Sequence, residues 1–354
     1  MFRLEARSEP SRTMRYASPL IAVALTLIGG IIVFAALGKN PLEGFRVFFL
    51  NPVKDAYGIS ELLLKATPLM LIAMGLAIGF RANVWNIGAE GQFVMGAAAA
   101  SGVALAWFNQ PLWWLLPAMV AAGAIGGALW AAIPALLRTR FNANEILVSL
   151  MLVYIAQLAI SWLVHGPWKD PEGFNFPQTR MFHDAAVLPL LVEGTRLNAA
   201  FGIAIGVLIA GYVFMNRSFL GYQMQVAGEA EAASRYAGFS ARRMVWIGML
   251  AGGGAAGLAG MGEVAGPMGQ LTEHVGNNYG FAAIIVAFVG RLNAVGIFFA
   301  SLLMALLYLG GEQAQQYLAL PSSISKVFQG MLLFFLLGTD LFVNYRVRRS
   351  GTHG

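Results

Sequence analysis

Long apolar segments alternate with short polar segments along most of this chain. A bilayer core about 30 Å thick is crossed by about 20 apolar residues in an α-helix. Ten segments approach that length, although two of them are short for a complete span. The pattern predicts an all-α polytopic membrane protein of about ten transmembrane helices, over residues 17–38, 58–80, 86–108, 112–137, 144–164, 198–215, 244–264, 277–291, 294–312 and 323–344.

The composition excludes an ordinary soluble domain. Of the 354 residues, 58% are hydrophobic and 11% are charged, whereas soluble domains have about 45–50% apolar and about 25% charged residues. Too few polar residues remain to cover a soluble core of this size. We therefore expect membrane lipid as a partner and a single membrane domain over 1–354, with long outer loops at 39–57 and 165–197 and a long inner loop at 216–243.

Arginines predict the orientation of the spans. Four lie ahead of the first span, at Arg3, Arg7, Arg12 and Arg15. Basic residues close to the ends of membrane helices favour the cytoplasmic side. With the N-terminus inside, ten spans also return the C-terminal arginines to the inside, so both termini are expected to be cytoplasmic. The net charge of +6 is then mostly an orientation signal, and no nucleic acid is expected as a partner.

The richest polar stretch lies where the second and third spans meet, and its sequence from Phe80 to Phe93 is FRANVWNIGAEGQF. Polar groups at this density are costly in lipid unless they line a cavity or find partners. Irregular backbone at membrane depth is tolerated only against protein or water. We interpret the stretch as a broken helix near 83–91 that lines a pathway with Asn83, Asn86, Glu90 and Gln92. The alternative is a polar inner loop with an asparagine N-cap, but a cap needs only one of these side chains.

A second polar cluster, at Asn142, Asn144 and Glu145, precedes the fifth span. An asparagine N-cap followed by a glutamate in the first turn suits the dipole of a helix. The same side chains could face the pathway. Both interpretations of Asn144 and Glu145 stay open on the sequence.

The inner loop contains a short predicted helix. Residues 229–234 favour a helix, and Gly238 is a natural C-terminal stop. Small residues there allow another surface to approach closely, and Tyr236 and Arg235 offer an apolar and a charged anchor. The helix could dock to a soluble partner or rest on the anionic inner leaflet.

Glycines recur at GxxxG spacing in 248–266, which predicts close packing between helices. Chemistry-bearing patterns are missing elsewhere. The chain has no cysteine, four scattered histidines and no phosphate-binding loop of the GxxxxGK[ST] type. We expect no catalytic residue, no metal site and no cofactor bound by this chain. Uphill transport would then draw its energy from another subunit.

Three stretches resemble the permease subunits of bacterial ABC importers of the branched-chain amino acid and simple-sugar superfamily, and most of all its nucleoside-type permeases, which work with binding proteins of the basic-membrane-protein family. The stretches are 80–92, 144–146 and 228–238, and the similarity covers essentially the whole chain. The last stretch is similar to the coupling helix that docks on the ATPase. There the family typically shows Glu-Ala-Ala, three residues and Gly, whereas the positions counted back from Gly238 hold Ala232, Ala233 and Ser234.

The resemblance implies a transport subunit rather than an enzyme, in a bacterial cytoplasmic (inner) membrane. It implies three protein partners: a second homologous permease, an ATPase subunit that carries ATP and Mg, and an extracytoplasmic substrate-binding protein. The solute is expected to be nucleoside-like, with Trp85 as a stacking face; a simple sugar is the alternative, and a stand-alone secondary transporter is a weaker one. The implied ATPase-coupling residues are Gly228, Glu229, Ala232, Ala233, Ser234, Arg235, Tyr236 and Gly238.

Overall fold

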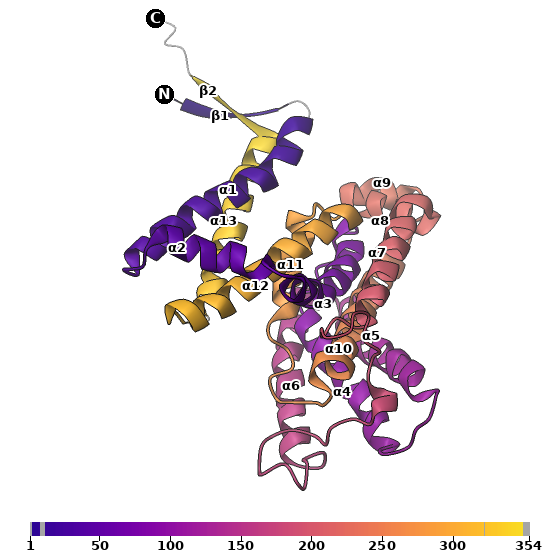
Figure 1. Ribbon diagram of the computed structural model, residues 1–354. Coiled ribbons are helices and arrows are strands. Elements are labelled where there is room, and N and C mark those ends of the chain that lie inside the picture. Colours follow the sequence, from indigo (N-terminus) through magenta and orange to yellow (C-terminus); the bar gives the residue numbers. More distant parts are fainter. Residues whose placement is uncertain (1, 8–10, 322, 350–354) are drawn as a thin grey trace, which may run out of the picture. The chain divides into compact units, whose positions relative to one another are not determined.

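The computed structural model describes residues 2–7, 11–321 and 323–349, and helices make up most of them (Figure 1). The long helices are α1 (Arg12–Ala36), α3 (Ala56–Arg81), α4 (Ala89–Ala106), α5 (Leu115–Phe141), α6 (Glu145–His165), α7 (Ala200–Arg217), α10 (Ala241–Glu263), α12 (Ala294–Leu318) and α13 (Ile324–Asn344). The shorter ones are α2 (Pro41–Phe45), η1 (Arg46–Leu50), η2 (Asn51–Val53), η3 (Asp184–Ala186), α8 (Phe219–Glu229), α9 (Glu231–Tyr236), η4 (Val264–Met268) and α11 (Tyr279–Val289).

The predicted all-α polytopic class is confirmed. Among the described residues, eight helices are long and apolar enough to cross a membrane. They correspond to eight of the ten predicted spans. The other two predicted spans contain α4, which has 18 residues, and α11. The cytoplasmic location of both termini stays a prediction.

Helix α11 differs most from the expected span over 277–291. It has 11 residues, so it is about 16 Å long, roughly half of a bilayer core. Left-handed backbone at Asn277 and Asn278 delays its start, and the chain turns again at Arg291 and Leu292, whose φ angles are 55° and 51°. The apolar sequence indicated a span, but these turns limit the helix to a half-length segment.

The chain divides into two compact units, residues 1–59 with 306–354 and residues 60–305. In the first unit, α1 lies against α13 (Figure 1), and the hydroxyls of Ser18 and Thr339 are 2.9 Å apart between them. Near the other ends of these helices, the ring of Phe328 stacks on Phe48 and contacts Phe34. The single permease domain expected from the sequence stays a prediction.

A short ribbon joins the two ends of the described chain in the first unit. Strand β1 (Phe2–Ala6) pairs antiparallel with β2 (Tyr345–Arg349), and the register places Phe2 opposite Arg349. Glu5 and Arg346 form an ion pair across it at 3.1 Å. The sequence did not predict this ribbon, because its strands are short and lie outside the apolar pattern.

In the second unit, α10 contacts α4 and α5 and lies against Gly75 of α3, and its glycines allow that approach. A Cβ atom on Gly257 would lie 2.1 Å from the carbonyl oxygen of Gly123 on α5. A Cβ on Gly260 would lie 2.0 Å from the carbonyl oxygen of Phe93 on α4. The predicted packing role of the glycine-rich span is confirmed. The same unit holds an ion pair between a buried glutamate and a half-exposed arginine, in which Arg196 Nε donates to Glu61 Oε1 at 2.9 Å.

We predict that Gly257→Ala destabilises the protein, because the new methyl group overlaps a backbone atom that cannot move freely. Overpacking of this kind costs about 1–3 kcal/mol. Gly206→Ala on α7 is the matched control, since nothing lies within 4 Å of a Cβ there and both variants gain the same helix propensity. The midpoint of thermal unfolding in detergent should fall for Gly257→Ala only, and equal midpoints would contradict the packing role.

Candidate functional site

The stretch predicted to contain a broken helix near 83–91 includes a non-helical segment, which is called the break below. Helix α3 ends at Arg81, seven residues without helical structure follow, and α4 begins at Ala89. Asn83 adopts a left-handed φ of 56° at the start of the break. Its side-chain oxygen accepts a hydrogen bond from Trp85 Nε1 at 2.7 Å. This bond fixes the first turn of the break.

Trp85 belongs to a cluster of three aromatic rings. Its ring centroid is 5.2 Å from that of Phe80 on α3 and 5.9 Å from that of Phe288 on α11. Phe80 and Phe288 stack on each other at 5.3 Å. The break is therefore attached to α11 on this side by ring contacts. The role of Trp85 as a stacking face for solute stays a prediction.

Asn86 and Gln92 bond to each other. Asn86 Nδ2 donates to Gln92 Oε1 at 2.8 Å, and Gln92 Nε2 donates to Asn86 Oδ1 at 2.9 Å. The oxygen of Asn86 also accepts from the backbone N–H of Gly88 at 3.2 Å. Each of the two side chains is only 1% exposed. The pair holds the break against the first turn of α4, and contact of either amide with solute stays a prediction.

Glu90 lies in the first turn of α4 and connects it to α11. Its Oε1 accepts from the backbone N–H of Asn278 at 3.0 Å, and its Oε2 accepts from that of Gly280 at 2.6 Å. The first N–H groups of a helix have no partner within the helix, and the helix dipole favours a negative charge there. One carboxylate therefore stabilises the N-terminal ends of two helices.

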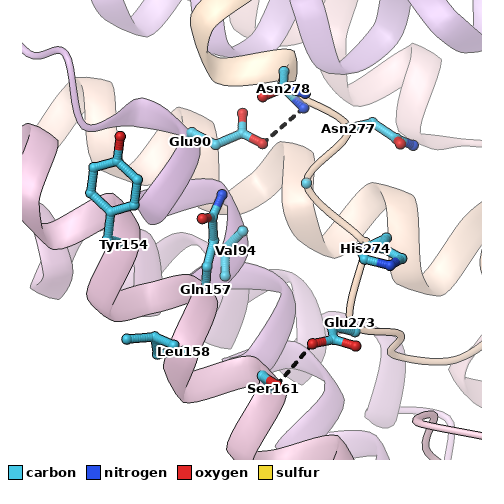
Figure 2. Close-up of a pocket in the computed structure, with 11 residues that line it drawn as sticks. Glu90, Val94, Tyr154, Gln157, Leu158, Ser161, Glu273, His274, Asn277 and Asn278 are labelled. Carbon is cyan, nitrogen blue, oxygen red and sulfur yellow. Dashed lines mark hydrogen bonds between the residues drawn. The ribbon is translucent and has the colours of Figure 1, made fainter.

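A cavity of about 570 Å³ lies beside this contact, within the 300–1,000 Å³ that is usual for small-molecule sites. Figure 2 shows α6 on one side of it and the segment before α11 on the other. Ser161 Oγ on α6 donates to Glu273 Oε1 at 2.8 Å between the two sides. The polar and aromatic lining residues are Glu90, Tyr154, Gln157, Ser161, Glu273, His274, Asn277 and Asn278.

Only Glu90 among the residues predicted to line a pathway borders this cavity. The sequence contained signals for the others. Gln157 interrupts an apolar span, and Glu273, His274, Asn277 and Asn278 form a polar run just before the short apolar segment of α11. The residues come together because α11 starts late and its preceding segment folds back toward α6, which a single sequence does not reveal.

Asn144 and Glu145 lie away from the cavity lining. Asn144 is the N-cap of α6 and accepts from the backbone N–H groups of Ile146 at 2.9 Å and Leu147 at 3.3 Å. Glu145 forms an ion pair with Arg138 near the end of α5. These contacts favour the structural interpretation of the cluster, and a pathway role stays a prediction.

The segment predicted to dock on an ATPase forms two short helices, α8 and α9, separated at Ala230. In α9 and the turn that follows it, Ser234 is buried, Tyr236 is 97% exposed and Gly238 has a φ of 76°. Ala232, Ala233 and Arg235 are also exposed. In α8, Gln225 Nε2 donates to Glu229 Oε1 at 2.9 Å, and Gly228 lies against the end of α3. An exposed helix with small residues and one aromatic anchor is suited to docking.

Within the described ranges, no group of three or more His, Asp and Glu side chains could hold a metal ion.

Residues 58–337 match the protein family described as "Branched-chain amino acid transport system / permease component". The match covers most of the chain, including the break, the cavity and the docking segment. The chain belongs to this permease family. It is thus a multi-pass membrane protein of a family of transport components, as expected from the polar break and the docking segment.

Three curated relatives of this permease are similar over nearly their whole length. The glucose ABC transporter permease protein of Haloferax volcanii is 34% identical over 97% of this chain and 94% of its own. The guanosine ABC transporter permease protein of Bacillus subtilis is 29% identical over 95% and 97%. The nucleoside ABC transporter permease protein of Lactococcus lactis is 28% identical over 92% of both.

We predict that the Asn86–Gln92 pair stabilises the permease. Asn86→Ala or Gln92→Ala leaves one buried amide without its partner, which costs about 1–3 kcal/mol. The double variant should lose less stability than the sum of the two single variants. Thermal unfolding of the purified protein in detergent measures this coupling, and additive losses would show that the two amides act independently.

Proposed function

We propose that this permease forms the translocation path of an ATP-driven importer for a nucleoside-like solute. The observation that carries the proposal is the cavity beside α6, whose lining combines hydrogen-bonding groups with an exposed tyrosine ring. Glu273, Gln157 and Asn277 could bond to the hydroxyls of ribose and the edge of a base. Tyr154, which is 58% exposed, offers a face on which a base can stack.

The partners proposed for this function follow from the family and from the exposed faces. A polar cavity that opened to lipid would be costly, and the neighbouring face of α6 exposes Ile155, Leu158 and Trp162. A second homologous permease covering this face would complete the path. The exposed helix α9 would dock on a separate ATPase that holds ATP and Mg, because this chain has no phosphate-binding loop. An extracytoplasmic binding protein would deliver the solute, and the complex would lie in a bacterial cytoplasmic membrane.

A simple sugar is the second candidate solute. The relative from Haloferax volcanii, which is 34% identical, is named a glucose permease, while two other relatives are named for guanosine and nucleoside. A sugar ring would use the same hydroxyl partners in the cavity. The two candidates differ in the importance of the tyrosine ring, because only a base stacks its full aromatic face.

Uptake of labelled nucleosides and sugars by cells that carry the complete transport operon, with and without this gene, tests the function. We expect loss of nucleoside accumulation only. Loss of sugar uptake alone would keep the permease and replace its solute. Unchanged uptake of both would contradict the proposal.

Tyr154 tests the nucleoside more sharply. We predict that Tyr154→Ala raises the KM for nucleoside uptake about tenfold or more, since stacking of one base on an aromatic ring contributes about 1–3 kcal/mol. Tyr154→Phe keeps the ring and should leave the KM near its original value. Leu129→Ala on α5 is a control for an exposed apolar residue outside the cavity. An unchanged KM in Tyr154→Ala would exclude stacking at this position.

A further inference from the structure

The contact between Glu90 and α11 is too closely packed to be incidental. A Cβ atom on Gly280 would lie 2.2 Å from the backbone nitrogen of Glu90, and one on Gly276 would lie 2.4 Å from Glu90 Oε1. Glycine at both positions therefore lets the start of α11 rest directly on the first turn of α4. The carboxylate is 1% exposed although it borders the cavity, and both of its oxygens accept backbone N–H groups.

A second close contact lies at the other end of the break. A Cβ atom on Gly228 in α8 would lie 2.0 Å from the carbonyl oxygen of Arg81, the last residue of α3. Arg81 Nη1 also donates to the carbonyl oxygen of Met215 on α7 at 3.4 Å. The segment that precedes α9 is thus in direct backbone contact with the last residue of α3, immediately before the break.

These contacts form a continuous series within residues 60–305. It starts at α8 and passes through Gly228 to Arg81. The break then leads to Glu90, and Glu90 holds the N-terminal end of α11. The segment held there carries the cavity residues Glu273, His274, Asn277 and Asn278 (Figure 2). Glu90 at its start and the ring contacts of Phe288 near its end attach α11 to the break, so this half-length helix can move with the break as a unit.

We propose that Glu90 is a positioning residue that holds α11 and its preceding segment at the cavity, and that the Gly228–Arg81 contact links this position to the docking segment. Glu90 then acts through α11 instead of binding solute itself. The inference rests on the proposed function, because it assigns the route by which an ATPase docked on α9 would change the cavity. If either the Glu90–α11 contact or the Gly228–Arg81 contact is broken, nucleotide binding to the ATPase should no longer move the segment before α11.

The chain lacks cysteine, so one introduced thiol reports on one site. The probe is His274→Cys, an exposed cavity position. A membrane-impermeant thiol reagent is applied to the complete importer in proteoliposomes, with and without a non-hydrolysable ATP analogue. In this parent we expect the nucleotide to change the labelling rate. Adding Glu90→Gln replaces one acceptor by a donor that faces a backbone N–H, and should bring the ratio of the two rates close to one.

Gly280→Ala and Gly228→Ala should also bring the ratio of the labelling rates with and without nucleotide close to one. Gly202→Ala on α7, where a Cβ meets nothing within 4 Å, should keep the parent's response.

Uptake kinetics distinguish a positioning role of Glu90 from solute binding. Glu90→Gln should lower the maximal uptake rate about tenfold, the effect of one charge-assisted hydrogen bond, and leave the KM near that of the unmodified protein.

Two outcomes would overturn the inference. A nucleotide response in Glu90→Gln equal to that of the parent, together with a raised KM, would make Glu90 a solute ligand. A parent that does not respond to nucleotide would show that α11 does not move with the ATPase. Neither result bears on the uptake assay without this gene, so a failure of the proposed function is recognised separately.

Discussion

One carboxylate connects the starts of two helices in a protein whose surroundings are mostly apolar. The N-terminal ends of α4 and α11 each present N–H groups without helical partners, and lipid offers no water to bond them. Glu90 lies in the first turn of one helix and accepts two N–H groups at the start of the other. Without this contact the backbone N–H groups of Asn278 and Gly280 would lose their acceptors beside the cavity. Because the segment before α11 lines the cavity, the contact of Glu90 with α11 also fixes one side of the cavity.

The glycines of α10 make that arrangement possible from the opposite side. Gly248 and Gly252 face the end of α3 and Asn86 in the break, while Gly257 and Gly260 bring the helix against α5 and α4. The break thereby packs closely against the backbone of α10, while the rings of Phe80 and Phe288 contact it through Trp85. The side-chain amide of Asn86 in the break then bonds to that of Gln92 in α4. Close packing and polar pairing together hold the irregular segment between α3 and α4.

The sequence predicted the features that depend on local pattern. Apolar length predicted the membrane helices, and the polar run after Phe80 predicted the break. It did not predict that α11 is half a span, because Asn277, Asn278, Arg291 and Leu292 impose turns that hydropathy does not detect. It also missed Tyr154, Gln157 and Ser161 of α6, since their meeting with Glu273 and His274 depends on how a distant segment folds back. Of the predicted pathway residues, Glu90 borders the cavity, whereas Asn86, Gln92 and Asn144 bond to nearby protein groups.

If the cavity beside α6 belongs to an aqueous path for solute, as proposed, its lining should be open to water. The most direct test is the accessibility of two single cysteines in the complete importer, Gln157→Cys in the cavity and Leu129→Cys on the exposed apolar face of α5. We expect a water-soluble thiol reagent to label the cysteine at position 157 and a transported nucleoside to slow this labelling, while the cysteine at position 129 stays unlabelled. Equal labelling of both positions, or labelling at position 157 that no solute affects, would show that the cavity is not part of a solute path.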